Sequence, residues 1–112
     1  MLHLEDDSDF AEIIKRGLAD KAKMTSVRTL AQAREAIKSD SFDLVVVDWD
    51  LPDGNGRDFI DDTEKQQSQA RIISLSATDS VIRDLRIDHE MAKSRTNLDD
   101  IVAKMANTAL SA

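Results

Sequence analysis

The feature that most constrains the fold is a short apolar run near the middle of the chain. The run is Phe42-Asp43-Leu44-Val45-Val46-Val47, in which five of the six side chains are apolar and three of these are β-branched valines. A strand with one wet face alternates apolar and polar residues, so an unbroken run predicts a parallel strand buried on both faces. Such a strand requires helices on both sides of its sheet.

Segments of two kinds alternate along the rest of the chain. Further strand candidates lie at residues 2–4, 24–28, 72–75 and 89–92. Helix candidates follow the possible caps Ser8, Thr29 and Thr96, and two more lie around Phe59 and around Val81. The apolar stripes that mark the helices are Phe10, Ile13, Ile14 and Leu18; Leu30, Ala33 and Ile37; Phe59 and Ile60; Val81, Ile82 and Leu85; and Leu98, Ile101, Val102, Met105 and Ala109.

The order of these segments is βαβαβαβαβα, which predicts an α/β fold with a parallel sheet. Right-handed crossovers favour the five-stranded order 2-1-3-4-5 with helices on both faces, as in flavodoxin-like proteins. The fourth helix is expected to be shortened, because its apolar residues support barely two turns. We expect one domain over residues 1–112, since the chain has room for a single core.

Composition excludes several classes of function. The chain has no cysteine, which rules out disulfides, thiolate metal sites and a cysteine nucleophile. Its net charge of −7 argues against nucleic-acid binding through a broad basic surface. No apolar run is long enough to span a membrane, and no signal-peptide pattern is present, so we expect a cytoplasmic protein.

Polar residues follow the predicted strands at the edge where parallel α/β sheets bind ligands. Glu5-Asp6-Asp7 follows the first strand, and Asp48-Trp49-Asp50 begins the segment after the third. Ser76 follows the fourth strand and Lys93 follows the fifth. The predicted strand order brings these carboxylates, a hydroxyl and an ammonium into one pocket.

This set of groups suits phosphoryl transfer. Neighbouring carboxylates repel by roughly 4 kcal/mol per pair at an effective dielectric of about 20, so they favour a hard cation such as Mg²⁺. Asp48 is then placed to act as a nucleophile towards phosphorus. Lys93 supplies positive charge to the phosphoryl oxygens, and Ser76 supplies a hydrogen bond that can draw its loop inward.

The signature blocks of the chain resemble those of response-regulator receiver domains. These blocks are Leu4-Glu5-Asp6-Asp7, Val45 to Gly54, Ile72 to Ala77 and Ala92-Lys93. The resemblance covers essentially the whole chain. It implies that Asp48 is phosphorylated, that Asp6 binds Mg²⁺ directly and Glu5 through water, and that the backbone carbonyl of Asp50 completes the protein ligands. It also implies that Ser76 is the switch hydroxyl and Lys93 the phosphoryl-binding cation.

Three departures from the family pattern lie in the output region. Lys93 follows Ser76 by 17 positions, fewer than is usual in the family. Glu90 stands where the family usually has an aromatic residue, and Ser94 where it has proline. A cis peptide before Ser94 would cost roughly 3 kcal/mol, so we expect a trans peptide there. The departures leave the predicted phosphorylation chemistry intact and bear on the output.

The same residues allow other interpretations. Taken alone, Asp6 and Asp7 are charges that favour a helix N-terminus, Lys93 is a surface lysine and Ser76 a loop hydroxyl. His3 is interpreted as a core histidine rather than a phosphohistidine. Asp48-Trp49-Asp50 matches a D-x-D phosphatase motif, but that class places its nucleophile on the first strand. A calcium loop from Asp48 fails at its fifth and sixth positions.

The preferred hypothesis is a receiver that takes a phosphoryl group from a sensor histidine kinase or a histidine phosphotransfer protein. It would be no enzyme beyond its own phosphorylation and slow autodephosphorylation, and it would signal through protein contacts. Asp50 and Thr78 are expected to tune the phosphate lifetime. The alternative is a receiver-like interaction module, or a phosphate sink with a degenerate output face.

Overall fold

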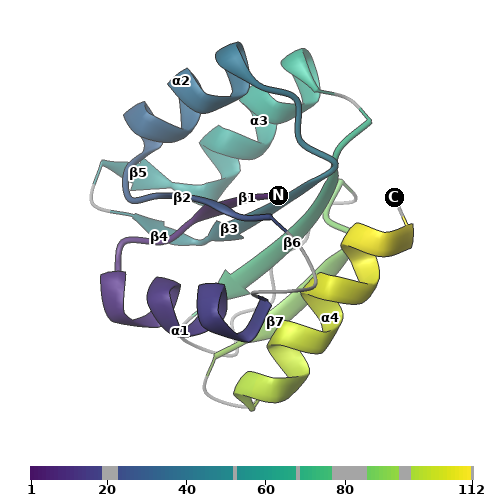
Figure 1. The fold of residues 1–112 in the computed structure, drawn as a ribbon. Coiled ribbons are helices and arrows are strands. Elements are labelled where there is room, and N and C mark those ends of the chain that lie inside the picture. Colours follow the sequence, from purple (N-terminus) through teal and green to yellow (C-terminus); the bar gives the residue numbers. More distant parts are fainter. Residues whose placement is uncertain (19–22, 52, 68, 77–85, 94–96, 112) are drawn as a thin grey trace.

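A five-stranded parallel sheet forms the middle of the molecule (Figure 1). The computed structural model describes residues 1–18, 23–51, 53–67, 69–76, 86–93 and 97–111. The sheet has the order β2-β1-β3-β6-β7, with every neighbouring pair parallel. Once a separate small hairpin is set aside, this is the predicted order 2-1-3-4-5, which is therefore confirmed. The strands are β1 (Leu2–Leu4), β2 (Thr25–Val27), β3 (Leu44–Asp48), β6 (Arg71–Ser76) and β7 (His89–Ala92).

Helices cover both faces of the sheet, as the buried apolar run predicts. α2 (Leu30–Ser39) and α3 (Gly56–Gln66) lie on one face, and α1 (Ser8–Leu18) and α4 (Leu98–Ser111) on the other (Figure 1). The predicted α/β, flavodoxin-like class is confirmed. The predicted short helix with Val81, Ile82 and Leu85 lies outside the described residues.

Strand β3 contributes to two hydrophobic cores at once. Leu44 and Val46 pack among buried residues of α1, β6 and α4. Val45 and Val47 pack on the opposite face, among buried residues of β1, α2 and α3. All four side chains are fully buried. Successive side chains of a strand point to opposite faces, so a strand between two helical layers needs apolar residues at every position.

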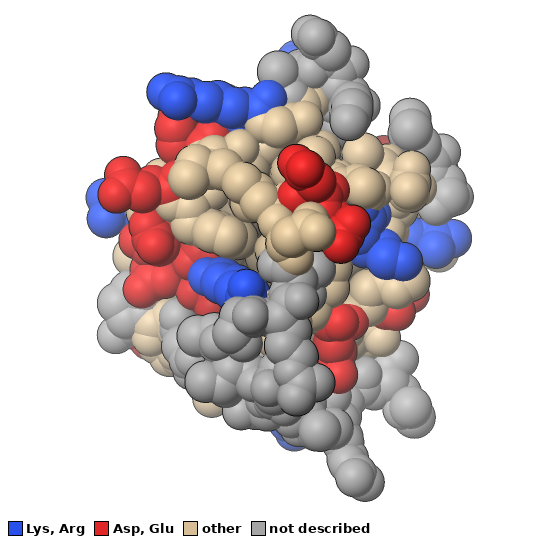
Figure 2. All heavy atoms as spheres, turned by 90° about the horizontal axis from the view of Figure 1, so that it is seen from below, with Lys and Arg blue, Asp and Glu red and all other residues tan. Residues whose placement is uncertain are grey.

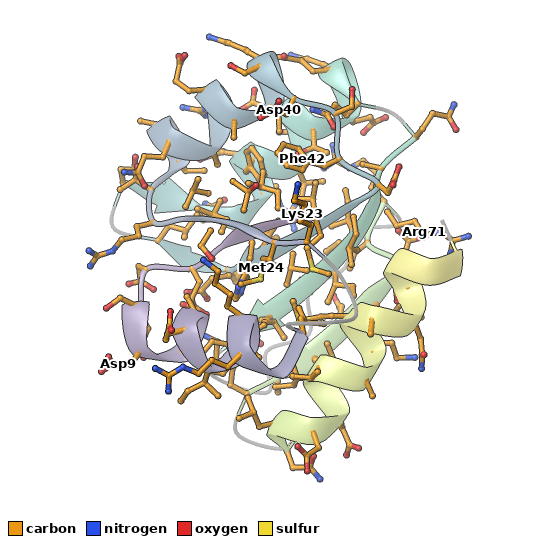
Figure 3. All side chains as sticks on the ribbon, in the orientation of Figure 1. Asp9, Lys23, Met24, Asp40, Phe42 and Arg71 are labelled. Atoms are coloured by element: carbon orange, nitrogen blue, oxygen red, sulfur yellow. The ribbon has the colours of Figure 1, made fainter. Side chains whose placement is uncertain are left out.

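Side chains beside the sheet follow the same two-layer division. Figure 3 shows Phe42 on the side of α2 and α3 and Met24 towards α1, and each packs against the core of its own side. Two apolar residues expected in the core are exposed instead. Ile13 of α1 is 44% exposed and Leu98 of α4 is 37% exposed, because Ile13 lies at the edge of its apolar stripe and Leu98 is the first residue of its helix.

The caps of two helices differ by one residue from the prediction. Asp7, rather than Ser8, caps α1: its carboxylate accepts hydrogen bonds from the backbone N–H groups of Asp9 and Phe10. Asn97 caps α4 by accepting from the N–H of Asp100 at 2.8 Å; the predicted cap, Thr96, lies outside the described residues. Carboxylate and amide oxygens are as effective at this position as hydroxyls, so a polar run leaves the boundary ambiguous.

The predicted cap of α2 is confirmed, and it has a second component from a distant loop. The Thr29 hydroxyl accepts a hydrogen bond from the N–H of Gln32 at 3.2 Å. Strands β4 (Asp50–Leu51) and β5 (Gly54–Asn55) form an antiparallel hairpin directly after β3. From this hairpin, the Asp53 carboxylate accepts from the N–H groups of Leu30 and Ala31 at 2.9 and 3.3 Å. The hairpin is thereby tied to the start of α2.

Candidate phosphoryl-acceptor site

The carboxyl ends of β1 and β3 lie side by side because the two strands pair in register. Leu4 pairs with Val47, so Glu5 and Asp48 are the next residues on adjacent strands. The backbone N–H of Glu5 also donates to the carbonyl of Val27 in β2. β1 runs from the N-terminus towards the edge where α1 begins and where the β4–β5 hairpin lies (Figure 1). The acidic segment that follows β1 and the one that begins at Asp48 therefore lie next to each other at this edge.

Three carboxylates gather at this edge. One carboxylate oxygen from each of Glu5, Asp6 and Asp48 lies within 4.8 Å of the others. Glu5 is fully buried and Asp48 is 4% exposed, whereas Asp6 is exposed. Buried like charges at such distances are costly unless a proton or a cation compensates them. The cluster is suited to a hard divalent cation with oxygen ligands.

The electrostatics of the cluster shift the pKa values of Asp48 and Asp6 in opposite directions. Burial raises the pKa of Asp48 to about 8, and the neighbouring Glu5 carboxylate adds to that rise. Burial also opposes the charge of Asp6, but a hydrogen bond from Asp48, with a further one involving Glu5, outweighs it and lowers the pKa of Asp6. With no cation bound, Asp48 is therefore the carboxyl group that keeps a proton at neutral pH.

Lys93 supplies the positive charge of the site. Its ammonium nitrogen lies 2.5 Å from Oε1 of Glu5 and 3.8 Å from Oδ2 of Asp48. The same nitrogen lies 4.5 Å from the centre of the Phe10 ring. The Lys93 side chain is only 22% exposed, so these interactions are partly shielded from water. The lysine predicted to bind a phosphoryl group therefore pairs with Glu5 and lies close to Asp48.

The remaining predicted residues are placed around this centre. Ser76 ends β6, next to the strand of Asp48, and is buried. Its carbonyl accepts the N–H of Lys93 at 2.8 Å, so these two residues are held together. The backbone of Asp50 pairs with Asn55 in the hairpin, while its side chain lies outside the described part of the structure. Thr78 also lies outside the described residues.

The chain at Gly56 passes close to Trp49 and holds the indole ring in place. The Trp49 carbonyl accepts the N–H of Gly56 at 3.0 Å. A Cβ atom at Gly56 would lie 2.9 Å from the Trp49 ring and 2.9 Å from Val47, so only glycine fits without movement. The guanidinium of Arg57 lies 5.8 Å from the centre of the half-buried Trp49 ring. The single indole of the chain therefore lies next to Asp48 and can report on it.

Two contributors to the site were not predicted from the sequence. Phe10 was expected only as a core residue of α1, and nothing in its spacing indicates a contact with Lys93. The role of Asp53 had a partial signal, because Pro52, Asp53 and Gly54 lie in one short segment of turn-forming residues. A hairpin turn places its side chains at the surface, but the sequence does not show which helix end such a side chain meets.

Comparison with known proteins settles the family. The response regulator receiver domain family matches residues 1–108 of the chain. The chain belongs to this family. The response regulator protein PilR of Pseudomonas aeruginosa is 30% identical over 81 residues, which are 71% of this chain and 18% of PilR. This receiver domain thus spans less than a fifth of the length of that relative.

Solved receiver domains share the fold. The response regulator TrrA of Thermotoga maritima, crystallised in complex with Mg²⁺-BeF, has a TM-score of 0.82 and 24% identity, with 96% of each chain covered. The HemR receiver domain of Leptospira biflexa, in its non-phosphorylated form, has a TM-score of 0.85 and 27% identity, covering 96% of this chain and 91% of that one. A CheY-like receiver protein of Methanospirillum hungatei reaches 0.86 at 19% identity, with 98% and 92% covered.

The surface of this receiver domain carries mixed charges. Figure 2 views it from the side of α1 and α4, where acidic and basic side chains are interspersed with uncharged residues. Among the described residues of this face, the basic side chains are separated and do not form a continuous basic surface. None of the described helices combines the length and the apolar character that crossing a bilayer requires.

Proposed function

We propose that this receiver domain accepts a phosphoryl group onto Asp48 from a phosphohistidine, with Mg²⁺ as cofactor, and signals through protein contacts. The observation that carries the proposal is the cluster of Glu5, Asp6 and Asp48 with Lys93 beside it. The phosphohistidine would belong to a sensor histidine kinase or a histidine phosphotransfer protein. Membership of the receiver family, which acts in two-component signalling, supports this role.

The donor set fits a magnesium ion. Glu5, Asp6 and Asp48 would hold it, together with the backbone carbonyl of Asp50. Bound there, the ion would offset the negative charge of the cluster and of an incoming phosphoryl group. The Mg²⁺-BeF complex of the related TrrA supports the same assignment here.

Asp48, Lys93 and Ser76 would each have a separate role in the proposed reaction. An Oδ atom of ionised Asp48 attacks the phosphorus, the P–N bond of the phosphohistidine breaks, and the electron pair leaves with the imidazole nitrogen. The ammonium of Lys93, already 3.8 Å from Asp48, would pair with the oxygens of the transferred group. The hydroxyl of Ser76 would donate a hydrogen bond to one of these oxygens. No separate substrate is turned over, so the domain would act as acceptor rather than enzyme.

The test uses Trp49 as a reporter next to Asp48. Mg²⁺ is titrated into the protein, beryllofluoride is then added as a phosphoryl mimic, and fluorescence is followed in the wild type and Asp48→Asn. We expect a saturable response to the metal, followed by a response to the mimic that the substitution abolishes. A response to the metal without a response to the mimic would instead favour the alternative of a receiver-like interaction module. No response to either would remove the proposed site.

A further inference from the structure

Within the described part of the chain, three close contacts of the Lys93 ammonium come from two kinds of group. Two are the carboxylates of Glu5 and Asp48, at 2.5 and 3.8 Å. The third is the ring of Phe10, which comes from α1 and faces the ammonium at 4.5 Å from its centre. A cation over an aromatic face is attracted by the negative potential of the ring. The carboxylates belong to the group proposed to bind Mg²⁺ and the phosphoryl group, whereas the ring takes no part in that binding.

A long side chain at this place needs more than one contact to stay ordered. A lysine side chain loses considerable rotamer freedom when it is fixed, and its ammonium is compact and strongly hydrated. The backbone of Lys93 is held through the carbonyl of Ser76. That bond places the Cα atom but leaves the side-chain torsions free to vary. The ring of Phe10 is therefore positioned to select among the directions in which the ammonium can point.

The Phe10 ring packs in turn against the buried ring of His3. His3 in the centre of β1 is fully buried, and its ring packs edge-on against Phe10 with centroids 6.3 Å apart at 64°. Phe10 also packs against the core on the side of α1 and α4. Burial, with a smaller contribution from Lys93, lowers the pKa of His3 to about 4, so the imidazole is neutral. The His3 imidazole thus contacts the Phe10 ring, and the Phe10 ring contacts the Lys93 ammonium, which pairs with the carboxylates.

We propose that Phe10 is a positioning residue that holds the Lys93 ammonium at Asp48 through the face of its ring. This inference rests on the proposed phosphoryl-acceptor function and adds a residue from α1 to it. The ring would keep the ammonium in place both before and after Mg²⁺ and the phosphoryl group bind. The expected consequence is a phosphoryl site in which Lys93 is ordered before the phosphoryl group arrives.

The test is a double-substitution cycle on the affinity for beryllofluoride at saturating Mg²⁺, read by Trp49 fluorescence. Phe10→Leu keeps an apolar side chain but removes the ring, and we expect it to weaken the mimic roughly 2- to 30-fold, the range of one cation–π contact. Phe10→Tyr retains the ring and should restore most of the affinity. In a Lys93→Ala background, Phe10→Leu should have no further effect. An equal loss with and without Lys93 would overturn the proposal, and so would a failure of Phe10→Tyr to restore.

A second measurement does not depend on binding of the mimic. Protons on the Lys93 side-chain carbon next to Nζ should show an upfield ring-current shift in NMR spectra of the ligand-free protein, and Phe10→Leu should abolish it. Unshifted protons in the wild type would refute the contact itself. Wild-type protein that shows the ring-current shift but no response to the mimic would refute the phosphoryl-acceptor function and leave the contact standing. Thermal unfolding of each variant reports any general loss of structure.

Discussion

Asp48 is the residue to which the proposed function assigns the phosphoryl chemistry. It ends a strand whose four preceding residues are apolar and fully buried, and an uncompensated carboxyl group is costly at such a place, which favours a functional explanation. The sequence predicts that position well, because a single acidic residue directly after a buried strand is distinctive. It does not predict that Lys93 lies closer to Glu5 than to Asp48, since that depends on side-chain torsions.

The raised pKa of Asp48 predicts that Mg²⁺ binding depends on pH. With no metal bound, Asp48 keeps its proton up to about pH 8, and the cation must displace that proton. The apparent affinity for Mg²⁺ should therefore rise as pH increases from 6, by up to about tenfold per unit, and level off above the pKa. Titration of Trp49 fluorescence with Mg²⁺ at several pH values measures this. In Asp48→Asn, which has no such proton, the slope should be much smaller; the same steep slope in both proteins would contradict the assignment.

The folded protein without metal should also respond to pH through Asp48. A carboxyl group whose folded pKa is raised binds more protons in the native state, so its contribution to stability is lost as pH rises from about 4 to about 8. The difference in the free energy of unfolding between Asp48→Asn and the wild type should grow over this window. We expect the substituted protein to be more stable at pH 8.5 by on the order of 1 kcal/mol. Urea unfolding at pH 6 and 8.5 without Mg²⁺ checks this, and a pH-independent difference would count against it.

At the scale of elements, the alternation of strands and helices could be predicted because each has a periodic apolar pattern. The β4–β5 hairpin could not, since its strands are too short to show a period. The caps of α1 and α4 were displaced by one residue because polar residues adjoin the predicted caps. The link between Asp53 and α2 joins residues more than twenty positions apart, and no local rule covers such a distance.

That link predicts an effect of Asp53 on α2. The N–H group of Leu30, and to a lesser extent that of Ala31, donates to the carboxylate and lowers the pKa of Asp53 against an opposing effect of desolvation. A lowered pKa means that the stabilisation is present above about pH 4 and is lost as pH falls below it. Asp53→Ala should lower the melting temperature and speed amide exchange at the two N–H groups, with Asp53→Asn intermediate. Asp9→Ala, in the first turn of α1, is the control and should leave exchange at α2 unchanged.

At the scale of the whole molecule, the two-sided burial of β3 joins the helical layers into one cooperative unit. The apolar run from Leu44 to Val47 indicates this arrangement from the sequence, and both cores confirm it. The sequence does not separate core from margin within a helical stripe. Ile13 and Leu98 match the period yet are exposed, because tertiary packing decides where a stripe ends.

Substitutions in either core should destabilise the entire domain. Phe59 of α3 and Met105 of α4 lie on opposite faces and are fully buried. Truncation of either to alanine should cost about 2–5 kcal/mol, a large part of a typical total of about 5–15 kcal/mol. Leu98→Ala is the matched control in the same helix and should cost about 0.5 kcal/mol or less. Urea unfolding followed by Trp49 fluorescence and by circular dichroism should give coincident transitions; separate transitions would contradict a single unit.

The central claim is that Asp48 is the phosphoryl acceptor. The most direct measurement is incubation of the protein with a small phosphoramidate and Mg²⁺, followed by intact-mass analysis and by reduction of the acyl phosphate with borohydride to mark the modified residue. We predict one added phosphoryl group per chain, located at Asp48, lost on chelation of the metal before the reaction and absent in Asp48→Asn. Unmodified wild-type protein, or a phosphoryl group found at another residue, would contradict the account.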